Sequence, residues 1–95
     1  MKTSIRIADK DIAVSEIRYA ESYGNYVKIF CNSQSLLERM TLTELESLLM
    51  DMGFLRCHRR HIVNGSRVVN CHPRCVELDD GSKVPLSRTY ESVFK

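Results

Sequence analysis

The apolar residues of this chain change their spacing once, and that change limits the folds that the chain can adopt. From Thr41 to Met52 the large apolar residues recur at helical spacing, at positions 42, 45, 48, 49 and 52. The residues TLTE at 41–44 form a capping-box sequence, and Gly53 follows the last apolar position. Elsewhere the chain consists of short alternating segments, which are typical of strands. A helix-turn-helix needs two adjacent helices, so a chain with one clear helix cannot present its recognition helix.

The remaining segments predict a mostly β fold. It has short-stranded antiparallel sheets, one main α-helix at about residues 41–52 and a short C-terminal helical turn near residues 86–90. Extended segments are expected at residues 5–7, 12–14, 17–22, 26–31, 54–57, 61–64, 67–71, 76–78 and 84–86. Residues 35–40 fit either a strand or a helix. Turns are expected at residues 9–11, at Gly24-Asn25 and at Asp80-Gly81, and Pro85 indicates an edge strand because it has no N–H to donate.

Length and composition indicate one globular unit. A chain of 95 residues has room for one modest core, so we expect a single domain over residues 1–95. Its 43% hydrophobic and 27% charged residues are those of an ordinary globular protein. Neither a signal-peptide pattern nor an apolar stretch of membrane-spanning length is present, so we expect a cytoplasmic protein without a membrane partner. Its four cysteines are expected to be reduced thiols.

Positive charge is concentrated in one block between Met52 and Val76. This block contains five arginines, three histidines and no carboxylate, although the net charge of the chain is only +2. Such a block favours a phosphate-binding surface. An arginine fork fits either a phosphate or the major-groove edge of guanine, and Arg59-Arg60 could supply one of each. The alternative is a solvated basic face that pairs with the acidic side of the helix.

Zinc binding, catalysis and RNA binding are three other functions to compare with the residues of the chain. A zinc site from Cys57-His58-x-x-His61 and Cys71-His72-x-x-Cys75 is disfavoured, because neither segment has the usual C-x2-C spacing. A small buried thiol and solvent-facing imidazoles are the preferred interpretation, and we expect no metal and no cofactor. The arginines are expected to lower the Cys57 pKa, but no oxyanion loop is evident, so we expect no enzyme. RNA binding is disfavoured by the apparent lack of clustered exposed aromatic residues.

Four ordered motifs resemble the LytTR (LytR/AlgR-type) DNA-binding domain of bacterial response regulators. They are IRYAESYGNYV at residues 17–27, TLTELE at 41–46, F-x-R-x-H-R-x-x-I-V-N at 54–64, and Asp80-Gly81 followed by P-x-S-R-x-Y at 85–90. The resemblance implies a β fold whose loops enter successive major grooves on one side of the duplex and bend it. It gives base-reading roles to Asn25, Tyr26, Arg59 and Arg88. It gives phosphate contacts to Lys28, His58, Arg60 and Ser87.

The chain departs from the pattern of that family at three neighbouring positions. Arg60 stands where serine is usual, His61 where an aromatic residue is usual, and Cys57 where valine is common. Arg60 should raise phosphate affinity, and Cys57 permits the hypothesis of a redox switch.

The resemblance also implies a larger protein. In the family an amino-terminal receiver, when phosphorylated, promotes dimerisation on paired repeats. The 95 residues contain no receiver, which leaves open whether the chain is part of a longer regulator or free-standing. We therefore expect sequence-specific binding of double-stranded promoter DNA for transcriptional regulation, as the effector domain of a two-component response regulator. The alternative is a non-enzymatic module that is zinc-stabilised or binds RNA or protein.

Overall fold

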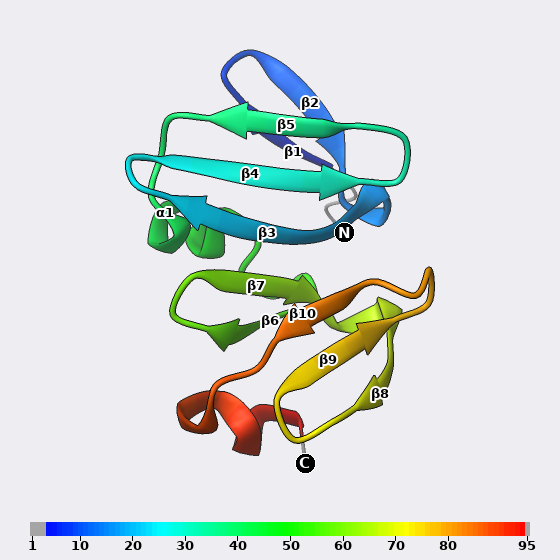
Figure 1. The fold of residues 1–95 in the computed structure, drawn as a ribbon. Helices are drawn as coiled ribbons and strands as arrows, with labels where there is room; N and C mark the ends of the chain where they lie inside the picture. The colour runs from blue at the N-terminus through cyan, green and yellow to red at the C-terminus, as the bar shows by residue number, and fades with distance from the viewer. Residues whose placement is uncertain (1–3, 95) are drawn as a thin grey trace.

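The structure is a computed structural model that describes residues 4–94. A five-stranded antiparallel sheet in the order β5-β4-β3-β7-β6 forms its centre (Figure 1). Its strands are β3 (Ile17–Tyr23), β4 (Tyr26–Cys31), β5 (Ser35–Glu38), β6 (Phe54–His58) and β7 (His61–Asn64). Three more strands form the β10-β9-β8 sheet, namely β8 (Val68–Cys71), β9 (Cys75–Leu78) and β10 (Lys83–Pro85). The other elements are the β1 (Ser4–Ile7) and β2 (Lys10–Ala13) hairpin, α1 (Leu42–Leu48), and the 3-10 segments η1 (Val14–Glu16), η2 (Gly65–Arg67) and η3 (Arg88–Phe94).

The central sheet carries a hydrophobic core on each face. The first core joins the inner side chains of β3 and β4 with α1 and the β1–β2 hairpin. The second core joins Cys57 and Val63 with residues of the three-stranded sheet, and Tyr90 and Phe94 of η3 pack against it. Strand β7 lies between the two cores, since Ile62 belongs to the first and Val63 to the second. Alternation alone does not reveal a strand that is covered on both faces.

The capping box at the start of the helix is confirmed. The Thr41 Oγ1 accepts from the Glu44 amide at 3.1 Å, and the Thr41 amide donates to the Glu44 carboxylate at 3.0 Å. The helix itself is shorter than the expected 41–52, because α1 ends at Leu48 and two turns follow. Asp51 and Gly53 have φ of 65° and 84°, in the left-handed region where a right-handed helix cannot continue. The apolar positions Leu49 and Met52 therefore reach the core from a turn.

The mostly β architecture is confirmed, with small corrections near the N-terminus. The first turn lies at Ala8-Asp9, both with positive φ, and the second strand starts at Lys10 and ends at Ala13. Residues 35–38 form a strand. The turns at Gly24-Asn25 and around Asp80-Gly81, the edge position of Pro85 and the C-terminal helical segment η3 are confirmed. No helix within residues 4–94 is long and apolar enough to cross a bilayer.

Candidate nucleic-acid interface

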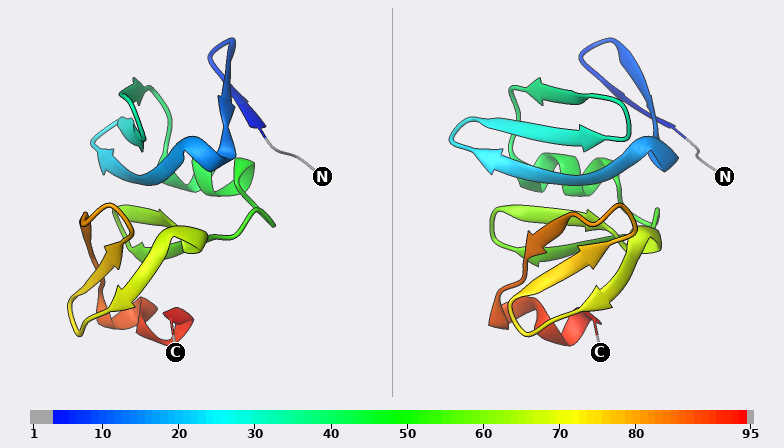
Figure 2. Two further views of the ribbon diagram at one scale, coloured as in Figure 1. Left: turned by 90° about the vertical axis from the view of Figure 1, so that its right-hand side faces the viewer. Right: turned by 45° about the vertical axis from the view of Figure 1, so that its right-hand side comes forward.

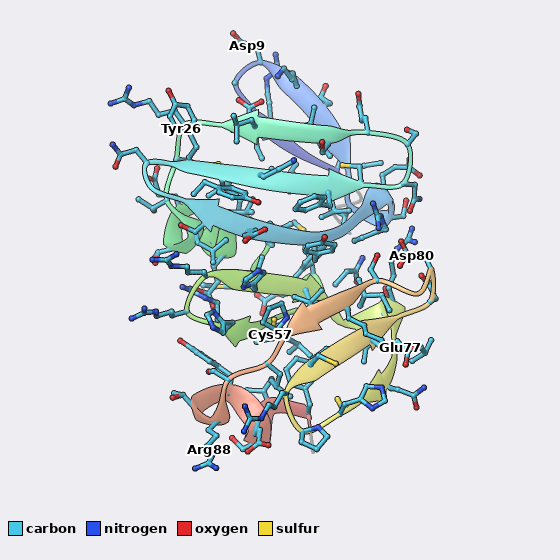
Figure 3. The ribbon with its side chains drawn as sticks, in the orientation of Figure 1. Asp9, Tyr26, Cys57, Glu77, Asp80 and Arg88 are labelled. Carbon is cyan, nitrogen blue, oxygen red and sulfur yellow. The ribbon has the colours of Figure 1, made fainter. Side chains whose placement is uncertain are left out.

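Three connecting segments lie along the same side of the molecule. They are the β3–β4 turn at residues 24–25, the β6–β7 turn at residues 59–60 and the segment at residues 86–88 that leads from β10 into η3. Figure 1 and the right panel of Figure 2 agree on this. Figure 3 shows Tyr26 and Arg88 on this side, and Glu77 and Asp80 on the other. The side chains of Asn25, Tyr26, Arg59, Arg60 and Arg88 are exposed. The three segments form the tips of this side, and five of the eight residues expected to contact DNA are exposed at a tip or next to one.

Backbone hydrogen bonds tie the three segments together. The Ser22 amide, at the end of β3, donates to the Arg60 carbonyl at 2.9 Å. The Ser87 amide donates to the Cys57 carbonyl at 2.9 Å. Because these bonds link the segments pairwise, the β6–β7 turn fixes the position of both other segments relative to itself. Base recognition depends on such fixed placement of side chains.

Arg56 holds the β6–β7 turn in shape from within. Its guanidinium donates to the carbonyls of His58 at 3.0 Å and Arg59 at 2.6 Å, and forms an ion pair with Glu46 of α1 at 2.9 Å. The His58 Nδ1 accepts from the Arg60 amide at 3.1 Å. These contacts occupy the Arg56 side chain, which is mostly buried, and leave Arg59 and Arg60 pointing outward from a closed turn.

The basic block therefore divides into two groups. Arg56 pairs with Glu46, and Arg67 pairs with Asp79 at 3.6 Å. The alternative interpretation, a basic face that pairs with the acidic side of the helix, therefore holds for Arg56, because Glu46 belongs to α1. The carboxylate that pairs with Arg67 lies outside that helix. The other three arginines of the block make no ion pair within residues 4–94, namely Arg59, Arg60 and Arg74. Arg88, outside the block, makes none there either.

Lys28 lies on β4, on the part of the sheet surface that neither core covers. It is half-buried, and its ammonium stands 5.1 Å from the centre of the Phe30 ring. Tyr19 stacks on Phe30 with ring centres 4.3 Å apart, and Tyr23 and Tyr26 are directly opposite each other across β3 and β4. Tyr23 and Tyr26 are 49% and 41% exposed, so the expectation that the chain lacks clustered exposed aromatic residues is wrong. The signal was visible in the sequence as two aromatic residues four positions apart, and so on one face, in each of two paired strands.

Cys57 is fully buried in the second core. Burial raises the pKa of its thiol to about 12 and outweighs the lowering effect of Arg56. The expectation that nearby arginines lower this pKa is therefore wrong, because a thiolate in an apolar core loses more hydration than one guanidinium restores. At neutral pH the side chain is a thiol, and this environment gives no support to a redox switch.

His61 is buried, and the expectation of a solvent-facing imidazole is wrong here. Its Nε2 lies 3.5 Å from a Glu21 carboxylate oxygen, and its Nδ1 is buried without a partner within residues 4–94. The His58 ring stands edge-on at 5.2 Å. Burial lowers the pKa of His61, with smaller lowering from His58 and Arg60 and an opposing effect of Glu21. The imidazole ring of His61 therefore stays neutral at a pH at which a free histidine begins to bind a proton.

This lowered pKa predicts that stability falls in mild acid. In the unfolded chain His61 binds a proton at about pH 6.5, whereas in the folded chain it does so only at a lower pH. The contribution of His61 to the free energy of unfolding is therefore complete above about pH 6.5 and declines below it. We expect urea unfolding to give a smaller free energy at about pH 5.5 than at about pH 7.5, and His61→Phe to reduce that difference. An unchanged difference in His61→Phe would assign the pH dependence to other groups.

The structure does not bring together the residues of the disfavoured zinc site. Among the side chains of residues 4–94, no group of three or more His, Cys, Asp or Glu is placed to hold a metal ion. Cys57 is buried in the second core, whereas Cys71 is exposed.

A polar cleft lies beside the third segment. Its volume is 670 Å³, and its lining residues are His58, Pro73, Arg74, Pro85, Leu86, Ser87, Arg88 and Glu91. It contains three of the expected DNA contacts, His58, Ser87 and Arg88. It also contains Arg74, for which sequence reasoning proposed no individual role. The only signal for Arg74 was its membership of the basic block, because its proximity to Arg88 arises from the pairing of β9 and β10.

Within residues 4–94, the mostly β framework presents polar and basic side chains on one side, as a nucleic-acid-binding surface requires. Comparison with known proteins assigns the chain to a class of DNA-binding domains. The family described as the LytTr DNA-binding domain matches residues 10–95, and the chain belongs to this family.

Relatives and a solved structure agree with this assignment. The chain is 29% identical to the sensory transduction protein LytT of Bacillus subtilis over 101 residues, covering 99% of this chain and 42% of that protein. It is 29% identical to the transcriptional regulatory protein YpdB of Escherichia coli over 90 residues, covering 86% and 36%. The chain thus spans about two fifths of these relatives. A LytTr DNA-binding domain of a putative methyl-accepting/DNA response regulator from Bacillus cereus has a TM-score of 0.81 and 26% identity, covering 99% of this chain and 94% of that one.

Proposed function

We propose that this chain binds double-stranded promoter DNA sequence-specifically and so regulates transcription. The observation that carries the proposal is the placement of three exposed tips on one side of a tied β framework (Figure 1). In this proposal the tips enter the major groove at successive turns of the duplex and bend it. Asn25, Tyr26, Arg59 and Arg88 read base edges, and Lys28, His58, Arg60 and Ser87 contact phosphates.

The length of the relatives supports a proposal about the protein to which this domain belongs. Proteins named as sensory transduction and transcriptional regulatory proteins are more than twice as long as the matched region. We propose that residues 1–95 act as one DNA-binding domain, the effector of a two-component response regulator whose receiver lies elsewhere in a longer protein. Two copies would bind paired repeats. Promoter DNA as the partner places this activity in the bacterial cytoplasm.

Selection from random duplexes tests the proposal. Enrichment of one sequence, or of two copies of it at a fixed spacing, is the expected result, followed by fluorescence titration of the selected and a random duplex. Typical specific binding is about 10³-fold or more tighter than non-specific binding. Equal affinity for both duplexes would contradict sequence-specific binding. Single-stranded RNA is the informative competitor, because the open aromatic face of β3 and β4 favours it as the second candidate ligand.

Arg60→Ala is expected to weaken binding to all duplexes alike. Arg60 is exposed, makes no ion pair within residues 4–94, and follows Arg59 on the same turn. Loss of one phosphate contact makes the slope of log affinity against log salt shallower by roughly 0.9. The control is Arg6→Ala, which removes one positive charge from the β1–β2 hairpin. A slope in Arg60→Ala that equals the slope in Arg6→Ala would remove Arg60 from the phosphate contacts.

A further inference from the structure

We propose that the polar cleft beside Arg88 holds one phosphodiester of the bound DNA, and that Arg74 is a further DNA contact. This inference rests on the proposed function and deepens it. It assigns a role to a residue outside the four motifs, and it makes one site from side chains that are far apart in sequence.

The walls of the cleft come from three segments. His58 ends β6, Arg74 lies in the loop between β8 and β9, and Ser87 precedes η3. Backbone bonds fix them relative to one another, since the Leu86 amide donates to the Arg74 carbonyl at 2.9 Å and the Ser87 amide donates to the Cys57 carbonyl at 2.9 Å. The cleft is therefore formed in the free protein and needs no rearrangement to receive a ligand.

The groups on the walls are mainly donors. The Nδ1 of His58 accepts from the Arg60 amide, so in the neutral ring the proton is on Nε2, which remains able to donate to a ligand. The Ser87 hydroxyl is a second neutral donor. Arg74 and Arg88 are exposed, make no ion pair within residues 4–94, and carry the planar donor fork that fits phosphate oxygens.

One carboxylate, Glu91, also lines the cleft. Two guanidinium groups outnumber it, so the site keeps a net positive charge and favours an anion. A duplex that offers a base edge to Arg88 must carry its own backbone close by, and the cleft is the adjoining space with anion-binding groups. A phosphodiester held there would fix the register in which Arg88 meets a base.

We expect opposite changes in DNA affinity when two residues that line the cleft are replaced. Arg74→Ala should bind selected and random duplexes about tenfold more weakly in low salt, because one charged hydrogen-bond partner is lost. Its salt slope should be shallower by about 0.9, so that between about 50 and about 200 mM salt the wild type loses about 3.5-fold more affinity than the variant. Glu91→Gln should bind about twofold to fivefold more tightly, because a repelling carboxylate is removed.

Matched controls carry the same charge changes at the other end of the molecule. Arg6→Ala and Asp9→Asn alter the β1–β2 hairpin, and Figure 3 shows Asp9 and Arg88 at opposite ends. Both controls should bind both duplexes within about twofold of the wild type. Arg74→Lys serves as a second variant, which should keep the salt slope and lose affinity with the fork.

Replacing single phosphates of the selected duplex by neutral methylphosphonates locates the contact. We expect one position at which neutralisation weakens the wild type and leaves the affinity of Arg74→Ala unchanged. If Arg74→Ala behaves like Arg6→Ala, or if no position shows this coupling, the cleft does not hold a phosphate, while DNA binding by the rest of the surface stands. If the wild type binds no duplex in a salt-dependent way, the proposed function itself fails.

Discussion

Arg88→Ala is expected to weaken binding to the preferred duplex by about 1 to 3 kcal/mol and to flatten discrimination between duplexes. Arg88 is exposed at the start of η3, on the same side as the two turns, and no acidic side chain within residues 4–94 pairs with it. A bidentate contact with a guanine edge is lost in the variant, whereas non-specific contacts remain. The measurement is a titration of wild type and variant with selected and random duplexes.

Comparison with Arg6→Ala separates base reading by Arg88 from the effect of losing one positive charge. Both variants lose one positive charge, but only Arg88→Ala should change the ratio of the two affinities. Equal loss on the selected and the random duplex would make Arg88 a backbone contact. The exposure of Arg88 keeps the effect on folding small, which thermal unfolding of the variant should verify.

Asn64→Ala is expected to lower the free energy of unfolding by about 2 to 4 kcal/mol. The Asn64 amide donates to the Ile17 carbonyl at 2.9 Å, and its oxygen accepts from the Ser66 amide at 3.1 Å and the Ser66 hydroxyl at 2.8 Å. The side chain is only 3% exposed. Alanine would leave a buried carbonyl and an N–H without partners, in the strand that separates the two cores.

The control for this variant is Asn70→Ala. Asn70 is exposed on β8, and its single side-chain contact within residues 4–94 is a 3.5 Å approach to Glu77. We expect a change within about 0.5 kcal/mol, as at most surface positions. Urea unfolding of the three proteins gives the comparison. If Asn64→Ala were as stable as Asn70→Ala, the buried hydrogen bonds of Asn64 would make no net contribution.

Strand β7 contains the last three residues of the family motif at 54–64. The residues I-V-N at 62–64 predicted a strand, and the strand is present. The structure explains why each of these positions has its residue type. Ile62 and Val63 fill opposite cores, and the Asn64 side chain links β3 to η2 by hydrogen bonds. Such a division between two faces depends on which layers cover the strand, and local sequence does not encode that.

The candidate site was predicted in part. The Gly24-Asn25 tip followed from its turn residues, whereas the tips at residues 59–60 and 86–88 were implied by the family resemblance. Their gathering on one side depends on sheet order, in which β3 pairs with β7 and the β10 segment bonds to β6. The division of arginines into paired and free ones could not be read from the chain, because Glu46 lies 10 residues before Arg56 and outside the basic block.

By itself the sequence determined the capped helix, most strands, the turn residues and the excess of positive charge, because these depend on side chains a few residues apart. Only the tertiary structure decided which arginines are free, that His61 is buried, and that Arg74 lies in a cleft with Arg88. Ion pairing and burial depend on groups that approach through space, such as Arg18 and Asp80, 62 residues apart. The physical reason is that desolvation and Coulomb attraction act over a few ångströms of space, regardless of separation along the chain.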